Sequence, residues 1–270
     1  MPNQSDVIYR YDGTFDGLLC CVFESYYAAE VPADVTANDA FQATLFPSKV
    51  IVTDSHRAQR VLTSIPKRMG NAALDLAQKA FLTCLEQKAL AILLFLRLGY
   101  THGCAVTNML THAAVAPLVK AVRHLEREAH LLKGFVRFSA LNGVLAAEIE
   151  PKNCALPLLA QHFCERYPEE RFVIHDKTRG MALLYQPYTP RIVRAEGFRL
   201  PDADSGELAY RRLWKVFYDA IEVEGRHNPK CRMSHMPKRY WKYMTELRDE
   251  QKSVSDGVLP PPETPVLSIP

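Results

Sequence analysis

The cationic side chains near the C-terminal end of the sequence are the first candidates for chemistry. The stretch from Gly225 to Tyr243 reads GRHNPKCRMSHMPKRYWKY, with six Lys or Arg, two His, three aromatic residues and no acid. The whole chain has a formal net charge of only +3, so the positive charge is concentrated here. Cations interleaved with flat rings suit phosphates and stacked bases, and the stretch therefore predicts a nucleic-acid-binding segment.

The residues expected to contact nucleic acid run through the whole stretch. They are Arg226, Lys230, Arg232, His235, Lys238, Arg239, Tyr240, Trp241 and Lys242. Trp241 has a second interpretation of equal weight, in which it packs against the helix that carries Trp214. Pro229 and Pro237 interrupt helical continuity, so we expect a loop and then a short helix that begins near Pro237. The backbone amides of such a helix start favour an anion.

A second set of polar residues surrounds a predicted sheet in the middle of the chain. It comprises Glu128, His130, His162, Arg166, His175, Asp176 and Arg179. One interpretation makes His130 or His162 a general acid–base or a metal ligand that Asp176 orients. The other makes these residues surface or turn residues, and it is favoured because no spacing here is typical of a metal site. Successive strand residues point to opposite faces, so His175 and Asp176 should not enter one pocket unless the strand bulges.

Several common catalytic motifs are absent from the sequence. It contains no GxxxxGK[ST] phosphate loop, no GxGxxG after a strand, no GxSxG, no HExxH and no HxE followed by PCxxC. This excludes the common nucleoside-triphosphatase, dinucleotide-binding, α/β-hydrolase and zinc-deaminase classes. Seven cysteines without a CxxC pair indicate reduced thiols. No cofactor or metal is therefore implied, and whether the protein is an enzyme stays open.

The elements that must position these residues differ between the two halves of the chain. The chain begins with a strand at 7–11, a helix capped by Thr14, a loop at 31–39 and a strand at 49–53. Helical patterns at 71–98 and 103–132 follow, the latter interrupted or bent at Pro117. In the second half, strands at 134–141 and 144–150 flank Asn142-Gly143, a dipeptide that favours a tight hairpin. Next come a helix to residue 167, strands at 171–176, 181–186 and 191–196, and an amphipathic helix at 205–224.

These patterns predict an α+β protein. Its N-terminal half is mainly helical with a small sheet, and a mostly antiparallel sheet with packed helices follows. We expect portions at 1–132 and 133–252 and a flexible Pro-rich tail at 253–270, with one compact domain over 1–252 as the alternative. No uninterrupted apolar run approaches the length of a membrane span, and residues 89–96 indicate a buried helix. The N-terminus lacks the pattern of an export signal, which predicts a cytoplasmic protein.

Four blocks of the sequence resemble a known family. They are YDGTFDGLLCCVFESY, EREAHLLKGFVRF, HFCERYPEERFVIHDKTRG and EGRHNPKCRMSHMPKRYWKYMTEL, in this order up to about Leu247. Together they resemble a bacterial family described as DNA metabolism proteins, a domain of unknown function. The resemblance implies a partner, because members are typically encoded beside a radical-SAM protein of DNA modification or repair. Some members are fused to a domain similar to uracil-DNA glycosylase, which we do not expect in a chain that stops at Pro270.

Three functional hypotheses follow from the residues and the resemblance. The first is a protein that binds DNA in repair or modification as the accessory partner of a radical-SAM protein. The second is a nucleic-acid-processing enzyme whose site is built from His130, His162 and Asp176, with or without a metal. The third is a scaffold that uses the basic stretch to recognise an acidic protein surface.

Overall fold

The computed structural model describes residues 5–37, 46–221 and 228–247, and it has the predicted α+β class. The predicted tail at 253–270 and Arg226 lie outside the described residues. Contacts divide the chain into unit 1, Met1–Glu128 with Lys152–Ala155, and unit 2, Ala129–Pro151 with Leu156–Pro270. Each unit is described by itself below, and the proposed portions at 1–132 and 133–252 stay a prediction.

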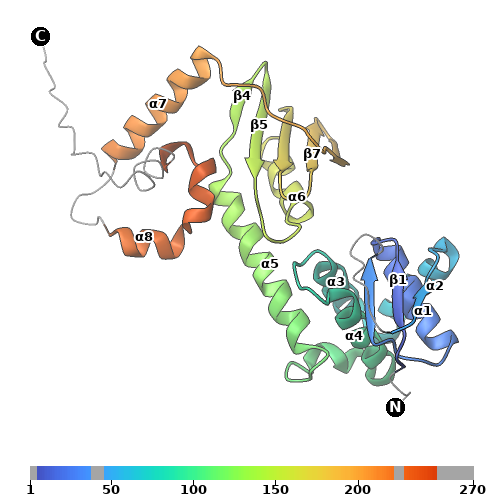
Figure 1. The fold of residues 1–270 in the computed structure, drawn as a ribbon. Coiled ribbons are helices and arrows are strands. Elements are labelled where there is room, and N and C mark those ends of the chain that lie inside the picture. The colour runs from blue at the N-terminus through green and yellow to red at the C-terminus, as the bar shows by residue number, and fades with distance from the viewer. Residues whose placement is uncertain (1–4, 38–45, 222–227, 248–270) are drawn as a thin grey trace, which may run out of the picture. The chain divides into compact units, whose positions relative to one another are not determined.

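Unit 1 consists of helices beside a small parallel sheet, drawn in blue to green in Figure 1. The strands are β1 (Ile8–Tyr11), β2 (Asp34–Ala37) and β3 (Ser48–Val50), in the order β2-β1-β3. The helices are α1 (Phe15–Tyr27), α2 (Ser55–Met69), α3 (Asn71–Phe81) and α4 (Lys88–His102). The α1 helix begins as predicted, because the Thr14 hydroxyl accepts a hydrogen bond from the Gly17 N–H at 2.9 Å.

Two local predictions for unit 1 are wrong, and a third is confirmed in one of its alternatives. The expected loop at 31–39 contains β2, which pairs in parallel with β1. The expected helix at 71–98 is interrupted between α3 and α4, where the Cys84 N–H donates to the Asn153 side chain instead of to a helical carbonyl. The helical stretch at 103–132, expected to be interrupted or bent at Pro117, is interrupted: a 3₁₀ turn (Gly103–Asn108) is followed by α5 (Ala116–Phe135). Pro117 is the second residue of α5, where its missing N–H costs no hydrogen bond.

The apolar helix predicted around residues 89–96 lies in the core of unit 1. The segment Lys88–Asn108 is, among the described residues, the one helix long and apolar enough to cross a membrane. Ile92, Leu93, Phe95 and Leu96 are nevertheless fully buried against other parts of unit 1. This burial is typical of a core helix in a globular protein.

Unit 2 is built on a five-stranded sheet in the order β4-β5-β6-β7-β8. The strands are β4 (Ser139–Leu141), β5 (Val144–Ile149), β6 (Phe172–Asp176), β7 (Met181–Gln186) and β8 (Thr189–Arg194). Only the β5–β6 pair is parallel, which confirms a mostly antiparallel sheet. The predicted hairpin is present, with Asn142 and Gly143 at φ values of 50° and 77°. Its first strand is shorter than predicted, because α5 continues to Phe135.

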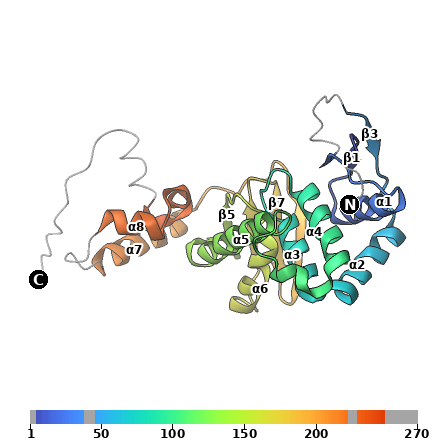
Figure 2. The same ribbon diagram turned by 90° about the horizontal axis from the view of Figure 1, so that it is seen from below.

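The two faces of this sheet are covered differently. The helix α6 (Leu156–Arg166) lies against one face, and Figure 2 shows it below the strands. On that face Phe138 joins Phe163, Tyr167 and Phe172 in edge-to-face contacts with ring centroids 5.5–5.8 Å apart. Over the other face runs an extended segment, residues 195–203, which we name the crossing segment. It packs through Ala195 and Leu200 on a small apolar patch of the strands.

The C-terminal part of unit 2 is more helical than predicted. The helix α7 (Ser205–Ala220) is followed by α8 (Pro229–His235), the 3₁₀ helix η4 (Lys238–Tyr243) and a short 3₁₀ turn (Thr245–Leu247). A loop was expected where α8 lies. The Asn228 side chain accepts a hydrogen bond from the Cys231 N–H at 3.0 Å and caps α8, with Pro229 in the first helical position. The expected helix start near Pro237 is present, because η4 begins at Lys238.

A buried carboxylate joins three distant segments of unit 2. Glu246 is 1% exposed and forms an ion pair of 2.7 Å with Arg137, which lies between α5 and β4. It also accepts a hydrogen bond of 3.0 Å from the indole N–H of Trp214 on α7. Burial is the largest single influence and raises the pKa of Glu246, but the hydrogen bonds from Arg137, the backbone and Trp214, together with the Arg137 charge, hold it below its ordinary value. The C-terminal turn, α7 and the start of β4 therefore share one charged contact.

Replacement of Glu246 by Gln should destabilise unit 2 by about 3 kcal/mol, because it leaves the Arg137 charge partly buried without its partner. Both tryptophans, Trp214 and Trp241, lie in unit 2, so urea unfolding followed by tryptophan fluorescence reports on this unit. The control is Asp219→Asn, which removes an exposed ion pair with Lys215 and should change stability by less than about 1 kcal/mol. Equal stability of the two variants would contradict this account.

The loss of stability caused by Glu246→Gln should depend on pH. The folded-state pKa of Glu246 is depressed, so its stabilising contribution is complete above about pH 4.5, the ordinary value, and is lost as the pH falls through the folded-state pKa. The difference in unfolding free energy between wild type and Glu246→Gln should therefore shrink as the pH is lowered in that range. A difference that stayed constant on acidification would assign the stabilisation to something other than the ionised carboxylate.

Candidate functional site

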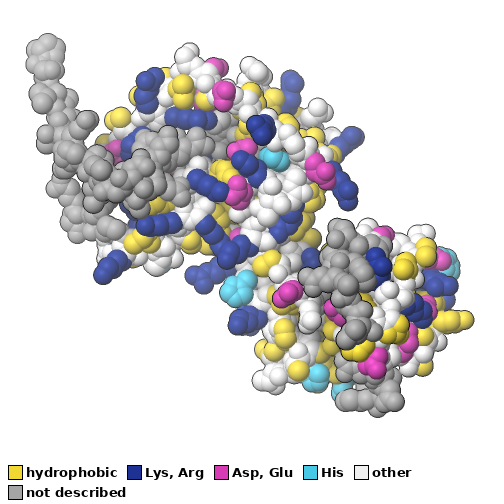
Figure 3. Space-filling model, viewed as in Figure 1, with side chains coloured by type: hydrophobic (Ala, Val, Ile, Leu, Met, Phe, Trp, Pro, Cys, Tyr) yellow, Lys and Arg dark blue, Asp and Glu magenta, His cyan; other side chains and the backbone are white. Residues whose placement is uncertain are grey.

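The described part of the basic stretch, residues 228–243, forms α8 and η4, and we name it the basic segment. Its cations and histidine are mainly on the surface. Exposed side chains are Lys230, His235, Lys238, Arg239 and Lys242, whereas Arg232 is partly buried. Figure 3 shows Lys and Arg side chains in dark blue over the face of unit 2 that is turned to the viewer. The basic segment therefore offers several cations to solvent.

The two aromatic residues predicted to stack on bases are covered. Tyr240 and Trp241 are 3% and 4% exposed, respectively. Tyr240 packs on Phe135 with ring centroids 5.4 Å apart, and the Trp241 indole donates to the Met236 carbonyl at 2.8 Å. The cations of Arg232 and Lys238 lie 5.2 and 5.8 Å from the centre of the Trp241 ring. A base could reach either ring only if the segment opened.

The basic segment is attached to the sheet through Glu150, the residue that follows β5. Lys242 forms an ion pair with this carboxylate, and the Tyr243 hydroxyl donates a hydrogen bond to it. Burial is the largest single influence and raises the pKa of Glu150, but these two hydrogen bonds, together with the charges of Lys242 and Lys177, hold the pKa below its ordinary value. The Tyr243 ring is thereby held at the edge of a cavity.

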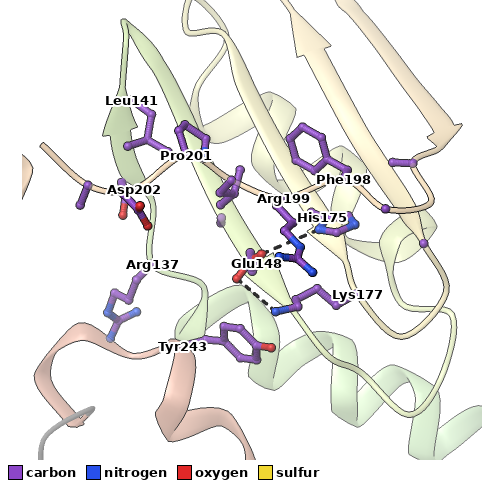
Figure 4. A pocket seen from close by; sticks show the side chains of 18 of the residues that line it. Arg137, Leu141, Glu148, His175, Lys177, Phe198, Arg199, Pro201, Asp202 and Tyr243 are labelled. Carbon is purple, nitrogen blue, oxygen red and sulfur yellow. Dashed lines mark ion pairs between the residues drawn. The ribbon is translucent and has the colours of Figure 1, made fainter.

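This cavity has a volume of about 670 Å³ and lies between the crossing segment and the strands that it covers. Figure 4 shows its polar side chains, which come from β5, β6, the crossing segment and the basic segment. Lining residues with polar or charged side chains are Arg137, Ser139, Glu148, His175, Lys177, Arg199, Asp202, Arg211 and Tyr243. Unit 2 thus brings the basic segment and a polar cavity together.

The floor of the cavity is formed by a carboxylate and an imidazole on neighbouring strands. Glu148 of β5 lies directly opposite His175 of β6 in the parallel register, so both side chains point to the same face. The Glu148 carboxylate is 3.9 Å from His175 Nδ1 and 3.7 Å from Lys177 Nζ, as the dashed lines in Figure 4 mark. His175 is 4% exposed, and within the described part of the chain neither ring nitrogen has a hydrogen-bond partner.

The arginines of the cavity differ in their availability. Arg137 is paired with Glu246, and Arg211 is paired with Glu207 at 2.8 Å. Arg199 has no carboxylate partner among the described residues, and Figure 4 shows it pointing into the space beside His175 and Glu148. Arg199 is therefore the cation most available to an anion in the cavity.

The structure does not gather His130, His162 and Asp176 around this cavity. His130 is exposed on α5, and His162 lies on α6, the helix that packs through Phe163 on the other face of the sheet. Asp176 and His175 do point to opposite faces, as expected from strand geometry. Burial lowers the pKa of His162, and Lys133 and Arg166 lower it further.

Asp176 has the role of a turn residue. It is fully buried, and it accepts hydrogen bonds from the Thr178 N–H at 2.9 Å and from the Arg179 guanidinium at 3.2 Å. Burial raises the pKa of Asp176 despite the opposing charge of Arg179. Within the described ranges, no three His, Cys, Asp or Glu side chains are grouped so that they could hold a metal ion.

Glu148, Lys177 and Arg199 were not singled out from the sequence. Their spacing carries no motif, and only the pairing of β5 with β6 and the path of the crossing segment place them beside His175. A period-two pattern at 144–150 does indicate that Glu148 shares a face with Ala146. Nothing in the sequence indicates which strand pairs with β5 and so places its side chains beside Glu148.

A second cavity, of about 810 Å³, lies in unit 1 between α1, α2 and α4. Phe23 and Tyr27 stack along one side with ring centroids 6.5 Å apart, and Arg60 lies over Phe23 at 5.4 Å. Arg68 and Tyr100 also line it. None of the described residues that line it has a buried polar atom without a hydrogen-bond partner, so we place the candidate functional site in unit 2.

The comparisons with known proteins agree with the expected family. A family model described as a domain of unknown function, DUF4130, matches residues 86–246, which is more than half of the chain. The matched region contains every residue that lines the cavity of unit 2 and ends at Glu246. No curated protein matches the chain. The chain therefore belongs to the DUF4130 family, a family of domains of unknown function.

Proposed function

We propose that the protein binds nucleic acid through unit 2 and acts in DNA repair or modification. In this proposal Lys230, Lys238 and Arg239 contact phosphates, and the cavity around His175 lies beside the bound strand. A cytoplasmic location is part of the same proposal. The role in DNA metabolism rests on the family resemblance, whereas the surface that binds is argued from the structure.

The observation that carries the proposal is the unbalanced charge of residues 228–247. This range contains five Lys or Arg and one acid, Glu246. That acid is buried and already paired with Arg137, so it neutralises none of the surface cations. Lys242 is paired with Glu150, which leaves Lys230 and Lys238 as exposed cations without a carboxylate partner among the described residues. Such cations gain most from phosphates, because binding releases the counterions of the nucleic acid.

The double variant Lys238→Ala/Arg239→Ala should weaken binding to a duplex oligonucleotide and flatten its salt dependence. Each phosphate contact contributes about 0.9 to the slope of log K against log salt concentration, so loss of two contacts should reduce the slope by about 2. Fluorescence anisotropy titrations at several salt concentrations measure both quantities. Lys242 is left unchanged because its pairing with Glu150 holds the segment in place.

The matched control is Arg191→Ala/Arg194→Ala, which removes the same charge from β8, at the opposite edge of the sheet from β4 and β5. This control should keep the wild-type slope. If the two double variants lost affinity equally, the basic segment would not be the binding surface, and if wild type bound no DNA the proposed function would be wrong.

A protein partner is the second part of the proposal. The resemblance suggests a radical-SAM protein of DNA modification or repair, and an apolar surface on α7 supports a protein contact. Five side chains with exposed fractions of 53–71% make up this surface. They are Tyr210, Leu213, Val216, Phe217 and Ile221. Contiguous exposed apolar side chains of this kind typically mark an interaction site.

Leu213→Asp/Phe217→Asp should abolish co-purification with a co-expressed radical-SAM protein of the kind that the resemblance implies. Both side chains are exposed and four residues apart on α7, so the change should leave the unfolding midpoint close to that of wild type. Arg212→Ala, also exposed on α7, is the control and should retain the complex. A complex that survived the double substitution would exclude α7 as the docking surface.

A nucleic-acid-processing enzyme is the second candidate function, and one observation favours it. His175 is buried with both ring nitrogens unpartnered in the described structure and lies beside a carboxylate, a pair that suits acid–base chemistry. The predicted set of His130, His162 and Asp176 would not be its site. Hydrolysis or modification of a DNA substrate that disappears in His175→Ala would select this candidate over a binding role.

A further inference from the structure

The cavity around His175 contains a buried polar group that has no hydrogen-bond partner among the described residues. His175 is 4% exposed, yet no described group donates to or accepts from either ring nitrogen. A buried polar group without a hydrogen bond costs about 1–3 kcal/mol. The cost disappears if a ligand in the cavity supplies a hydrogen-bonding group. The imidazole therefore indicates a binding site and not only a packed side chain.

The size and lining of the cavity fit an organic ligand. Its volume of about 670 Å³ lies within the roughly 300–1,000 Å³ that is usual for small-molecule sites. The floor is polar, with Glu148 and His175 side by side. Phe198 stands perpendicular to the imidazole with ring centroids 5.1 Å apart, and Leu141 and Leu200 complete an apolar wall. A flat ring with hydrogen-bonding edges matches this combination.

The mouth of the cavity fits a phosphate. Arg199 points into it and has no carboxylate partner among the described residues. Tyr243, whose hydroxyl is held by Glu150, lines the same cavity and belongs to the basic segment. A strand whose phosphates lie along the basic segment would therefore pass the opening.

We propose that the cavity takes a single nucleotide that has left the base stack of the bound strand. Glu148 accepts hydrogen bonds from N–H groups on the edge of the base, and His175 hydrogen-bonds the neighbouring ring atom. Arg199 contacts the phosphate of the same nucleotide, and Phe198 packs against the base. The inference rests on the proposed nucleic-acid binding and names what the site recognises. Unstacking is least costly for an unpaired or mismatched base, so the cavity would give a preference for such positions.

The test compares two duplexes, one fully paired and one with a single-nucleotide bulge that carries a fluorescent adenine analogue. Wild type should bind the bulged duplex about tenfold more tightly, the ratio produced by a free-energy difference of about 1.4 kcal/mol. The analogue should change its fluorescence on binding as it leaves the stack. Glu148→Gln and Arg199→Ala should lose this preference, so that each variant binds the bulged and the paired duplex with affinities within about twofold of each other.

Two features keep the outcomes distinct. Arg199 is exposed and Glu148→Gln preserves side-chain size, so neither variant should prevent folding. The control Arg191→Ala/Arg194→Ala should keep the preference for the bulged duplex. Equal wild-type affinity for the two duplexes would overturn the inference and leave the proposed binding intact. No binding to either duplex would overturn both. An unchanged preference in Glu148→Gln and Arg199→Ala would show that the nucleotide binds elsewhere.

Discussion

The ion pair between Glu246 and Arg137 is the contact on which the arrangement of unit 2 depends. A buried carboxylate is tolerated only when it is paired and hydrogen-bonded, and here Arg137 and Trp214 supply those bonds. The three residues come from the entry to the sheet, from α7 and from the C-terminal turn. Because the pair needs all three in place, it holds the basic segment against the edge of the sheet. The Glu150 contacts with Lys242 and Tyr243 then set its position beside the cavity.

The different covering of the two sheet faces explains why the cavity exists. On the α6 face, large rings around Phe138 fill the space between helix and strands. Among the described residues, the crossing segment is the main cover of the other face; it has no regular structure and packs on small residues such as Ala146 and Ala182. Small side chains beside Glu148 and His175 leave a volume that the crossing segment does not fill. A polar site on a rigid sheet is the result.

Much of the fold could be predicted because its signals are local. Thr14 and Asp54 accept hydrogen bonds from the N–H groups of the helices that they precede, and Asn142-Gly143 supplies the two positive φ angles of a tight hairpin. The failures come from contacts between residues far apart in the sequence. The β2 strand forms because β1 offers it an edge, and the break after α3 is stabilised by Asn153, 69 residues beyond Cys84.

The same distinction between local signals and long-range contacts applies to the candidate site. The basic segment was recognisable from composition, since charge and aromatic content can be read residue by residue. Burial of Trp241 could not be read in this way, because it depends on how η4 folds back on α8. Glu148 and His175 lie side by side because β5 pairs in parallel with β6, and α6 separates these two strands in the sequence. The set of His130, His162 and Asp176 was plausible from residue type alone, but His130 is exposed on α5, His162 lies on α6, and Asp176 is buried at a turn and paired with Arg179.

The central claim is that the basic segment and the His175 cavity form one nucleic-acid-binding surface. Ultraviolet crosslinking of the full chain to a single-stranded oligonucleotide, with mass spectrometry of the adducts, tests it most directly. The account predicts adducts at Tyr243 and Phe198, the two aromatic side chains that line the cavity. Adducts confined to unit 1, for example at Phe23 or Tyr27, would contradict it.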